Sequence, residues 1–197
     1  MAITHTNRKG QIYTLYQGQT KTGKPRYYFA RTEKIHDEPV TELPAGFTIS
    51  ESINGVVSLV KDRPVVILPE EVAVVEEVVR QHPKARQYRV AVKDKRIEIY
   101  EQVGPNFETL SGILQPTGRL DPGLAERMYA VEKRSAHYMP VMCFNLLDPA
   151  QRLFGVERMC YRSSVDGWLE LIHTGSVATL AQRLIPTLDT DEFYELL

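Results

Sequence analysis

Cysteine, long apolar runs and net charge are all scarce in this chain of 197 residues. The two cysteines, Cys143 and Cys160, are too few for a framework of disulfide bonds. No apolar run approaches the roughly 20 residues that a membrane-spanning helix needs. The formal net charge of −1 excludes a polycation, so any surface that binds nucleic acid has to be local.

The N-terminus also lacks the apolar segment that follows the charges of a secretory signal peptide. A hydrophobic fraction of 43% beside 25% charged residues is typical of a globular protein. We therefore predict a cytoplasmic protein with a packed core and no membrane partner.

The hydrophobic pattern predicts an α+β protein. Residues 1–62 form a small antiparallel β block of four short strands in this interpretation. Asn54-Gly55 suits the turn of its second hairpin, because both residues tolerate positive φ. Residues 63–197 form an α+β portion, which is either a second domain or a continuation of the first.

The second portion alternates helix and strand signals. Alternating apolar residues predict a hairpin over 88–100 and a three-stranded antiparallel meander over 138–172. We place the turns of the meander near Asp148-Pro149 and Asp166-Gly167. Residues 104–118 are interpreted as a long loop. Residues that suit an N-cap or a first helical turn mark four helix starts, at Pro69, Asp121-Pro122, Ser176 and Thr190.

Positive charge gathers at the start of the chain, on a predicted hairpin. Residues 12–17 and 26–31 are apolar and aromatic, and Thr20 to Pro25 supplies turn residues, so residues 10–31 predict a β-hairpin. No Asp or Glu precedes Glu33. Six basic residues do: Arg8, Lys9, Lys21, Lys24, Arg26 and Arg31.

This hairpin is the candidate nucleic-acid site. Alternation places Arg26 and Tyr28 on one face of the second strand. Lys21, Lys24 and Arg26 are then expected to contact phosphates, and Tyr28 to stack on a base. The acidic segment 33–42 would weaken this site if it folded back on the hairpin. The alternative is an edge hairpin whose lysines only discourage aggregation.

Residues 18–24 match most of a phosphate loop, GxxxxGK, but the next residue is Pro25 rather than Ser or Thr. A strand is also predicted where that loop requires a helix. We therefore expect no nucleotide cofactor, and no other cofactor.

Enzyme motifs do not assemble from the remaining polar residues. The five histidines are scattered without metal-ligand spacing, so no metal site is predicted. His137 and Cys143 are separated by six residues of predicted strand, about 20 Å, which is too far for a nucleophile pair. Two pairs of carboxylates, Glu98 with Glu101 and Asp148 with Glu157, could share a cleft and act as acid and base. Surface carboxylates in hairpins are usually only solvated, however.

The opening of the chain resembles a group of bacterial proteins. The resemblance is carried by THTNRKG from Thr4 to Gly10 and by TKTGKPRYYF from Thr20 to Phe29, and it extends to ESINGVV from Glu51 to Val57. It implies a bacterial, cytoplasmic protein. The group has no assigned activity, so the resemblance implies no catalytic residue.

These observations favour a non-enzymatic binding protein that contacts RNA or DNA through the basic hairpin. A protein–protein module or homodimer, using strands such as the one with Met139 and Val141, is the second interpretation. An enzyme with its site between the two portions, near residues 104–118, is the third.

Overall fold

The computed structural model describes residues 1–31, 37–104, 122–162 and 165–195 and has an α+β fold, as predicted. The chain divides into two compact units. Unit 1 comprises Met1–Arg63 and Gly104–His137, and unit 2 comprises Pro64–Val103 and Tyr138–Leu197. The second segment of unit 1 is therefore inserted into the sequence of unit 2.

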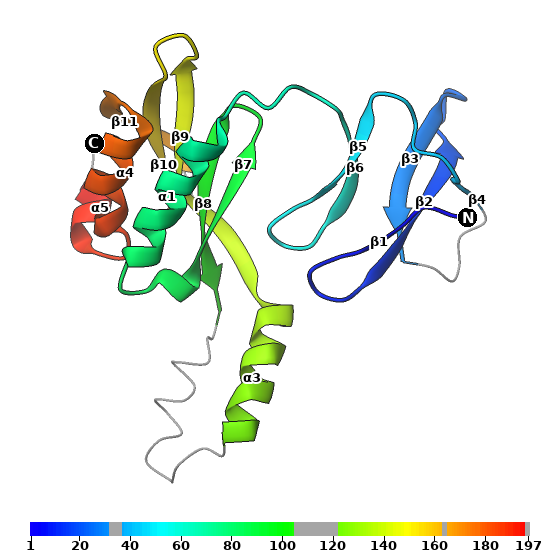
Figure 1. Cartoon of the computed structure of the whole chain (residues 1–197), viewed down its shortest axis with the longest axis horizontal. Helices are drawn as coiled ribbons and strands as arrows, with labels where there is room; N and C mark the ends of the chain where they lie inside the picture. Colours follow the sequence, from blue (N-terminus) through cyan, green and yellow to red (C-terminus); the bar gives the residue numbers. More distant parts are fainter. Residues whose placement is uncertain (32–36, 105–121, 163–164, 196–197) are drawn as a thin grey trace. The chain divides into compact units, whose positions relative to one another are not determined.

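Unit 1 is built around one long strand, β2. One edge of β2 pairs with β3, and the other edge pairs first with β1 and then with β4, all antiparallel. Strands β5 and β6 form a separate antiparallel hairpin (Figure 1). The bounds are β1 Thr4–Thr6, β2 Ile12–Gln19, β3 Pro25–Ala30, β4 Glu38–Pro39, β5 Phe47–Glu51 and β6 Val57–Lys61. The four predicted strands are present as β2, β3, β5 and β6, and the short strands β1 and β4 were not predicted.

The turns of unit 1 use glycine where the backbone is left-handed. Gly55 has φ of +78° in the β5–β6 turn, as the Asn54-Gly55 pair predicts. The helix predicted after Asp121-Pro122 is present as α3 (Pro122–Ser135). Of the loop predicted over 104–118, only Gly104 is among the described residues.

Unit 2 is a single antiparallel sheet of five strands in the order β11-β10-β9-β8-β7. Its strands are β7 Tyr88–Lys93, β8 Arg96–Val103, β9 His137–Asp148, β10 Leu153–Arg162 and β11 Val165–Gly175. The predicted hairpin and meander thus join in one sheet. The turn predicted near Asp166-Gly167 is displaced by a few residues, because both residues pair with β10 inside β11, which begins at Val165.

Helices α1 (Pro69–Gln81) and α4 (Val177–Leu184) pack against each other on this sheet (Figure 1). The valines of α1 are poor helix formers, so packing has to stabilise the helix. Val75 and Val79 are buried. Ser176 caps α4 as predicted, since its Oγ accepts a hydrogen bond of 3.2 Å from the Thr179 amide. Short 3-10 helices η1 (Ala85–Gln87) and η3 (Ile185–Thr187) and the helix α5 (Asp191–Glu195) complete the unit.

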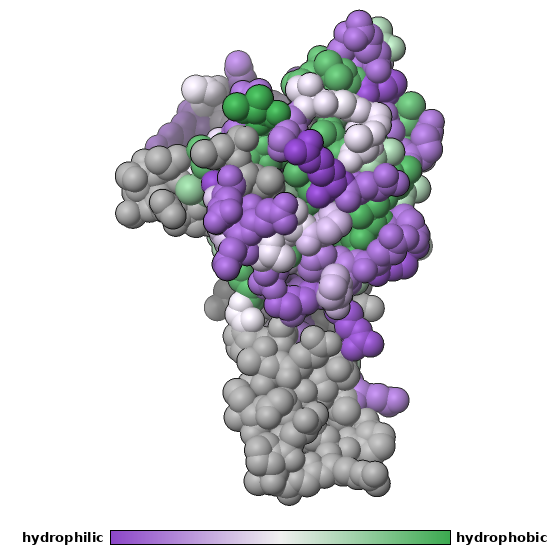
Figure 2. Space-filling view, turned by 90° about the vertical axis from the view of Figure 1, so that its left-hand side faces the viewer, coloured by the Kyte–Doolittle hydropathy of each residue, from purple (hydrophilic) through white to green (hydrophobic). Residues whose placement is uncertain are grey.

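The core of unit 2 lies between the sheet and these helices. Phe144 and Phe154 are fully buried at its centre, with Ile97 and Ile99 from β8 and Leu184 from α4. Figure 2 looks onto the side that carries α4 and α5 in Figure 1, and hydrophobic residues are mixed with hydrophilic ones on that face.

Candidate nucleic-acid interface

The tip of the β2–β3 hairpin is a closed turn that exposes two lysines. The Thr20 amide donates to the Lys24 carbonyl at 2.8 Å, and the Gly23 amide donates to the Thr20 carbonyl at 2.9 Å. Gly23 has φ of +76°, which explains the glycine. Lys21 and Lys24 are exposed, and neither forms an ion pair with an acidic residue in the described part of the chain. A strand follows this turn, which agrees with the rejection of a phosphate loop.

Three side chains share one face of the hairpin behind this tip. Tyr16 and Tyr28 are cross-strand partners, and their ring centroids are 6.0 Å apart at 28°. The guanidinium carbon of Arg26 lies 5.9 Å from the centroid of the Tyr28 ring. Tyr16 is buried, Tyr28 half-buried and Arg26 exposed. The predicted proximity of Arg26 and Tyr28 on one face is confirmed.

An acidic segment reaches the same face. The Tyr28 hydroxyl donates a hydrogen bond of 2.6 Å to Asp37 Oδ2, and this bond raises the pKa of Tyr28. Glu38 pairs with Gln17 in the short strand β4, and the Val40 amide donates to the Leu15 carbonyl. For residues 37–40 the folding back of the acidic segment is therefore confirmed. The contact between Asp37 and Tyr28 was not predicted, because nothing local in the sequence specifies it.

Gly18 makes room for this carboxylate. A Cβ atom at Gly18 would lie 2.5 Å from Asp37 Oδ2 and 3.5 Å from the Tyr28 ring. Heavy atoms cannot approach so closely, so any larger residue at position 18 would displace the carboxylate or distort the strand. The backbone of Gly18 is not left-handed, and space is the reason for the glycine here.

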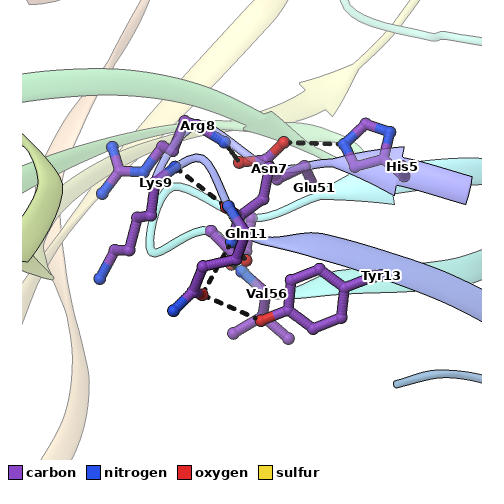
Figure 3. Close-up of polar contacts among 10 residues, drawn as sticks. His5, Asn7, Arg8, Lys9, Gln11, Tyr13, Glu51 and Val56 are labelled. Atoms are coloured by element: carbon purple, nitrogen blue, oxygen red, sulfur yellow. Dashed lines mark hydrogen bonds and ion pairs between the residues drawn. The ribbon is translucent and has the colours of Figure 1, made fainter. Parts of the chain in front are cut away.

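Of the other basic residues, Arg8 and Lys9 lie at the opposite end of β2, in the loop after β1 (Figure 3), and Arg31 follows the last residue of β3. Asn7 is buried in this loop, and its Nδ2 donates to the Gly55 carbonyl at 2.7 Å. Its Oδ1 accepts from the amides of Lys9 and Gln11. The basic end of the sequence is thus divided between two ends of the sheet, and only one end carries the predicted site.

Glu51 ties the same loop to β5. His5 Nε2 lies 2.9 Å from Glu51 Oε2, and the Arg8 amide donates to Glu51 Oε1 at 2.7 Å (Figure 3). Burial raises the pKa of Glu51, but the hydrogen bonds from His5 and Arg8 outweigh it, and the net pKa lies below its ordinary value. The loop therefore favours the ionised carboxylate.

Acid is expected to destabilise unit 1 through Glu51. Its lowered pKa means that the stabilisation is present above the pKa of the unfolded chain and is lost as the pH falls through the folded value. Urea midpoints measured from about pH 6 to about pH 3 should fall less steeply in Glu51→Gln than in the parent. Glu42→Gln, at an exposed position, is the control and should retain the parental slope. Equal slopes for Glu51→Gln and the parent would contradict this role.

A second polar cluster surrounds Arg96 in unit 2. Glu98 alternates with the core residues on β8, and its Oε1 lies 3.9 Å from Arg96 Nη1. Glu157 Oε2 lies 4.0 Å from the same nitrogen. The fully buried Cys143 donates to Glu157 Oε2 at 3.4 Å. From the sequence alone, Glu98 is paired with Glu101 and Glu157 with Asp148. The approach of Glu98 and Glu157 to the same arginine could not be predicted, because it depends on the register of the strands.

This cluster does not have the properties of a nucleophile site. Burial, followed by the charge of Glu157, raises the pKa of Cys143, so its thiol stays protonated at neutral pH. His137, the other member of the rejected pair, is exposed at the start of β9. Met139 and Val141 are half-buried on β9, and the pairing of β9 with β10 begins after them, at Met142.

No group of three or more His, Cys, Asp or Glu side chains within the described ranges is arranged to hold a metal ion. None of the described helices has the length and apolar character required to cross a bilayer.

Comparison with protein-family models, curated proteins and solved structures yields no match. The class of the protein is therefore given by its fold alone: an α+β protein of two compact units.

Proposed function

We propose that the protein binds nucleic acid, without catalysis, through the β2–β3 hairpin. Lys21 and Lys24 at the tip and Arg26 on β3 contact phosphates, and Tyr28 stacks on a base. The observation that supports this proposal most directly is the position of the Arg26 guanidinium beside the Tyr28 ring, on the hairpin whose tip exposes two lysines. A cation next to an aromatic face is the combination that single-strand binders use.

The expected strength of binding follows from this small number of contacts. Each phosphate contact on a single strand contributes a slope of about −0.7 to log K against log salt, so three cations predict a slope of about −2. Stacking of one base contributes roughly 1–3 kcal/mol. Binding should therefore be weak at physiological salt and tighten clearly at low salt.

The test is binding of the purified chain to labelled single-stranded RNA, single-stranded DNA and duplex DNA at several salt concentrations. Lys21, Lys24 and Arg26 are changed together to Glu in the test variant. The matched control carries the same charge change at the exposed Lys61, Lys93 and Lys95. We expect the hairpin variant to lose binding and the control to keep most of it.

Two results would refute the proposal. The first is an absence of binding by the parent even at low salt, which would leave the lysines as a solubility feature of an edge hairpin. The second is an equal loss of affinity in both variants, which would show that total charge rather than the hairpin controls binding.

A further inference from the structure

The carboxylate of Asp37 is fixed at the edge of the proposed stacking ring. Its Oδ2 accepts the hydrogen bond from the Tyr28 hydroxyl, and Gly18 leaves the space it occupies. The pairing of Glu38 and Pro39 with β2 holds the backbone next to it. A surface that bound only phosphates would gain nothing from an acid at this point, because like charges repel.

A carboxylate beside a stacking ring is suited to reading a base. An ionised carboxylate only accepts hydrogen bonds, and each oxygen has two lone pairs, so Asp37 keeps acceptor capacity beyond the bond from Tyr28. Single-stranded bases are recognised by stacking together with hydrogen bonds to their Watson–Crick edges. Guanine has two adjacent donors on that edge, N1–H and the N2 amino group, whereas each other base has donors at a single position.

We infer that the hairpin selects an unpaired guanine in single-stranded nucleic acid, with Tyr28 stacking on the base and Asp37 accepting from its Watson–Crick edge. This inference rests on the proposed function and adds base selectivity to it. Lys21, Lys24 and Arg26 then hold the neighbouring phosphates. Duplexes are poor ligands, because pairing already uses the donors of guanine.

The competing explanation is that Asp37 only reduces attraction to phosphates, and the two explanations predict opposite effects of removing its charge. If the carboxylate reads guanine, Asp37→Asn weakens binding to oligonucleotides with guanine and removes the preference. If the carboxylate only repels phosphates, Asp37→Asn strengthens binding to every oligonucleotide alike. Asn keeps an oxygen that can accept from Tyr28, so the change preserves the local contact.

The experiment uses uridine oligonucleotides that carry a single central guanosine, inosine or adenosine, and the corresponding thymidine series. The parent is expected to bind the guanosine oligonucleotide about tenfold more tightly than the adenosine one, the gain typical of one bidentate contact to a base. Inosine lacks the N2 amino group and should fall between them. The two series separate RNA from DNA as the source of the guanine.

Two further variants make the test specific. Glu38→Gln removes the same charge from an exposed neighbour and should keep the preference for guanosine. Gly18→Ala keeps all charges but displaces the carboxylate, and should lose the preference. Parental binding without base preference, or uniform tightening in Asp37→Asn, would overturn this inference alone. An absence of binding to all oligonucleotides would overturn the proposed function as well.

Discussion

Replacing Phe144 by Ala should lower the free energy of unfolding by about 3–5 kcal/mol, the typical cost of truncating a buried phenylalanine. Phe144 is fully buried on β9, the central strand of the unit 2 sheet. Phe154 on β10 and Leu184 of α4 belong to the same core. Truncation removes buried apolar surface and leaves a cavity that neighbours from both the sheet and the helices would have to fill.

Urea unfolding followed by circular dichroism measures this loss. Ile172→Ala is a matched control, because Ile172 lies on β11 of the same sheet but is 87% exposed. This control should change stability by no more than about 0.5 kcal/mol. A loss below about 1 kcal/mol in Phe144→Ala would contradict the assignment of Phe144 to the core.

Removing the carboxylate of Glu71 should destabilise unit 2 by about 2–3 kcal/mol. Glu71 is buried in the first turn of α1, where its Oε2 accepts from the Leu68 amide at 2.8 Å. Arg152, in the turn between β9 and β10, donates to both carboxylate oxygens. Glu71→Ala therefore removes a helix cap and leaves a partly buried guanidinium without its acid.

Two comparisons separate these contributions. Glu71→Gln keeps an acceptor for the Leu68 amide but loses the charge, so its loss of stability should be intermediate. Glu70→Ala removes an exposed acid from the same turn and should cost no more than about 0.5 kcal/mol. Equal stabilities of Glu70→Ala and Glu71→Ala would show that the contact with Arg152 contributes little.

Local signals in the sequence were sufficient for most elements of the fold. The proline at position 69 and the Ser176 cap mark where α1 and α4 begin. Alternating apolar residues identified the hairpin of β7 and β8, which closes at Asp94 with φ of +53°. Each of these features depends on residues within a few positions of one another, which is the range over which propensity and capping act.

Features that depend on distant residues were not predictable in the same way. Strand β4 exists because β2 offers it an edge, and its two residues carry no strand pattern. Asp166-Gly167 has the composition of a turn, but pairing with β10 keeps both residues extended. The contacts of Tyr28 with Asp37 and of Glu71 with Arg152 likewise require the folded chain, since neither residue pair has a local spacing rule.

The interrupted sequence of unit 2 has a consequence for the order in which the chain can fold during synthesis. The second segment of unit 1 separates β8 from its neighbour β9 in the sequence. Strand β8 therefore leaves the ribosome well before the strand it pairs with. The contact between α1 and α4 forms later still, since α4 follows all five strands in the sequence. The valine-rich face of α1 can therefore pack against β7 early in synthesis, but it can pack against α4 only when nearly all of unit 2 has been made.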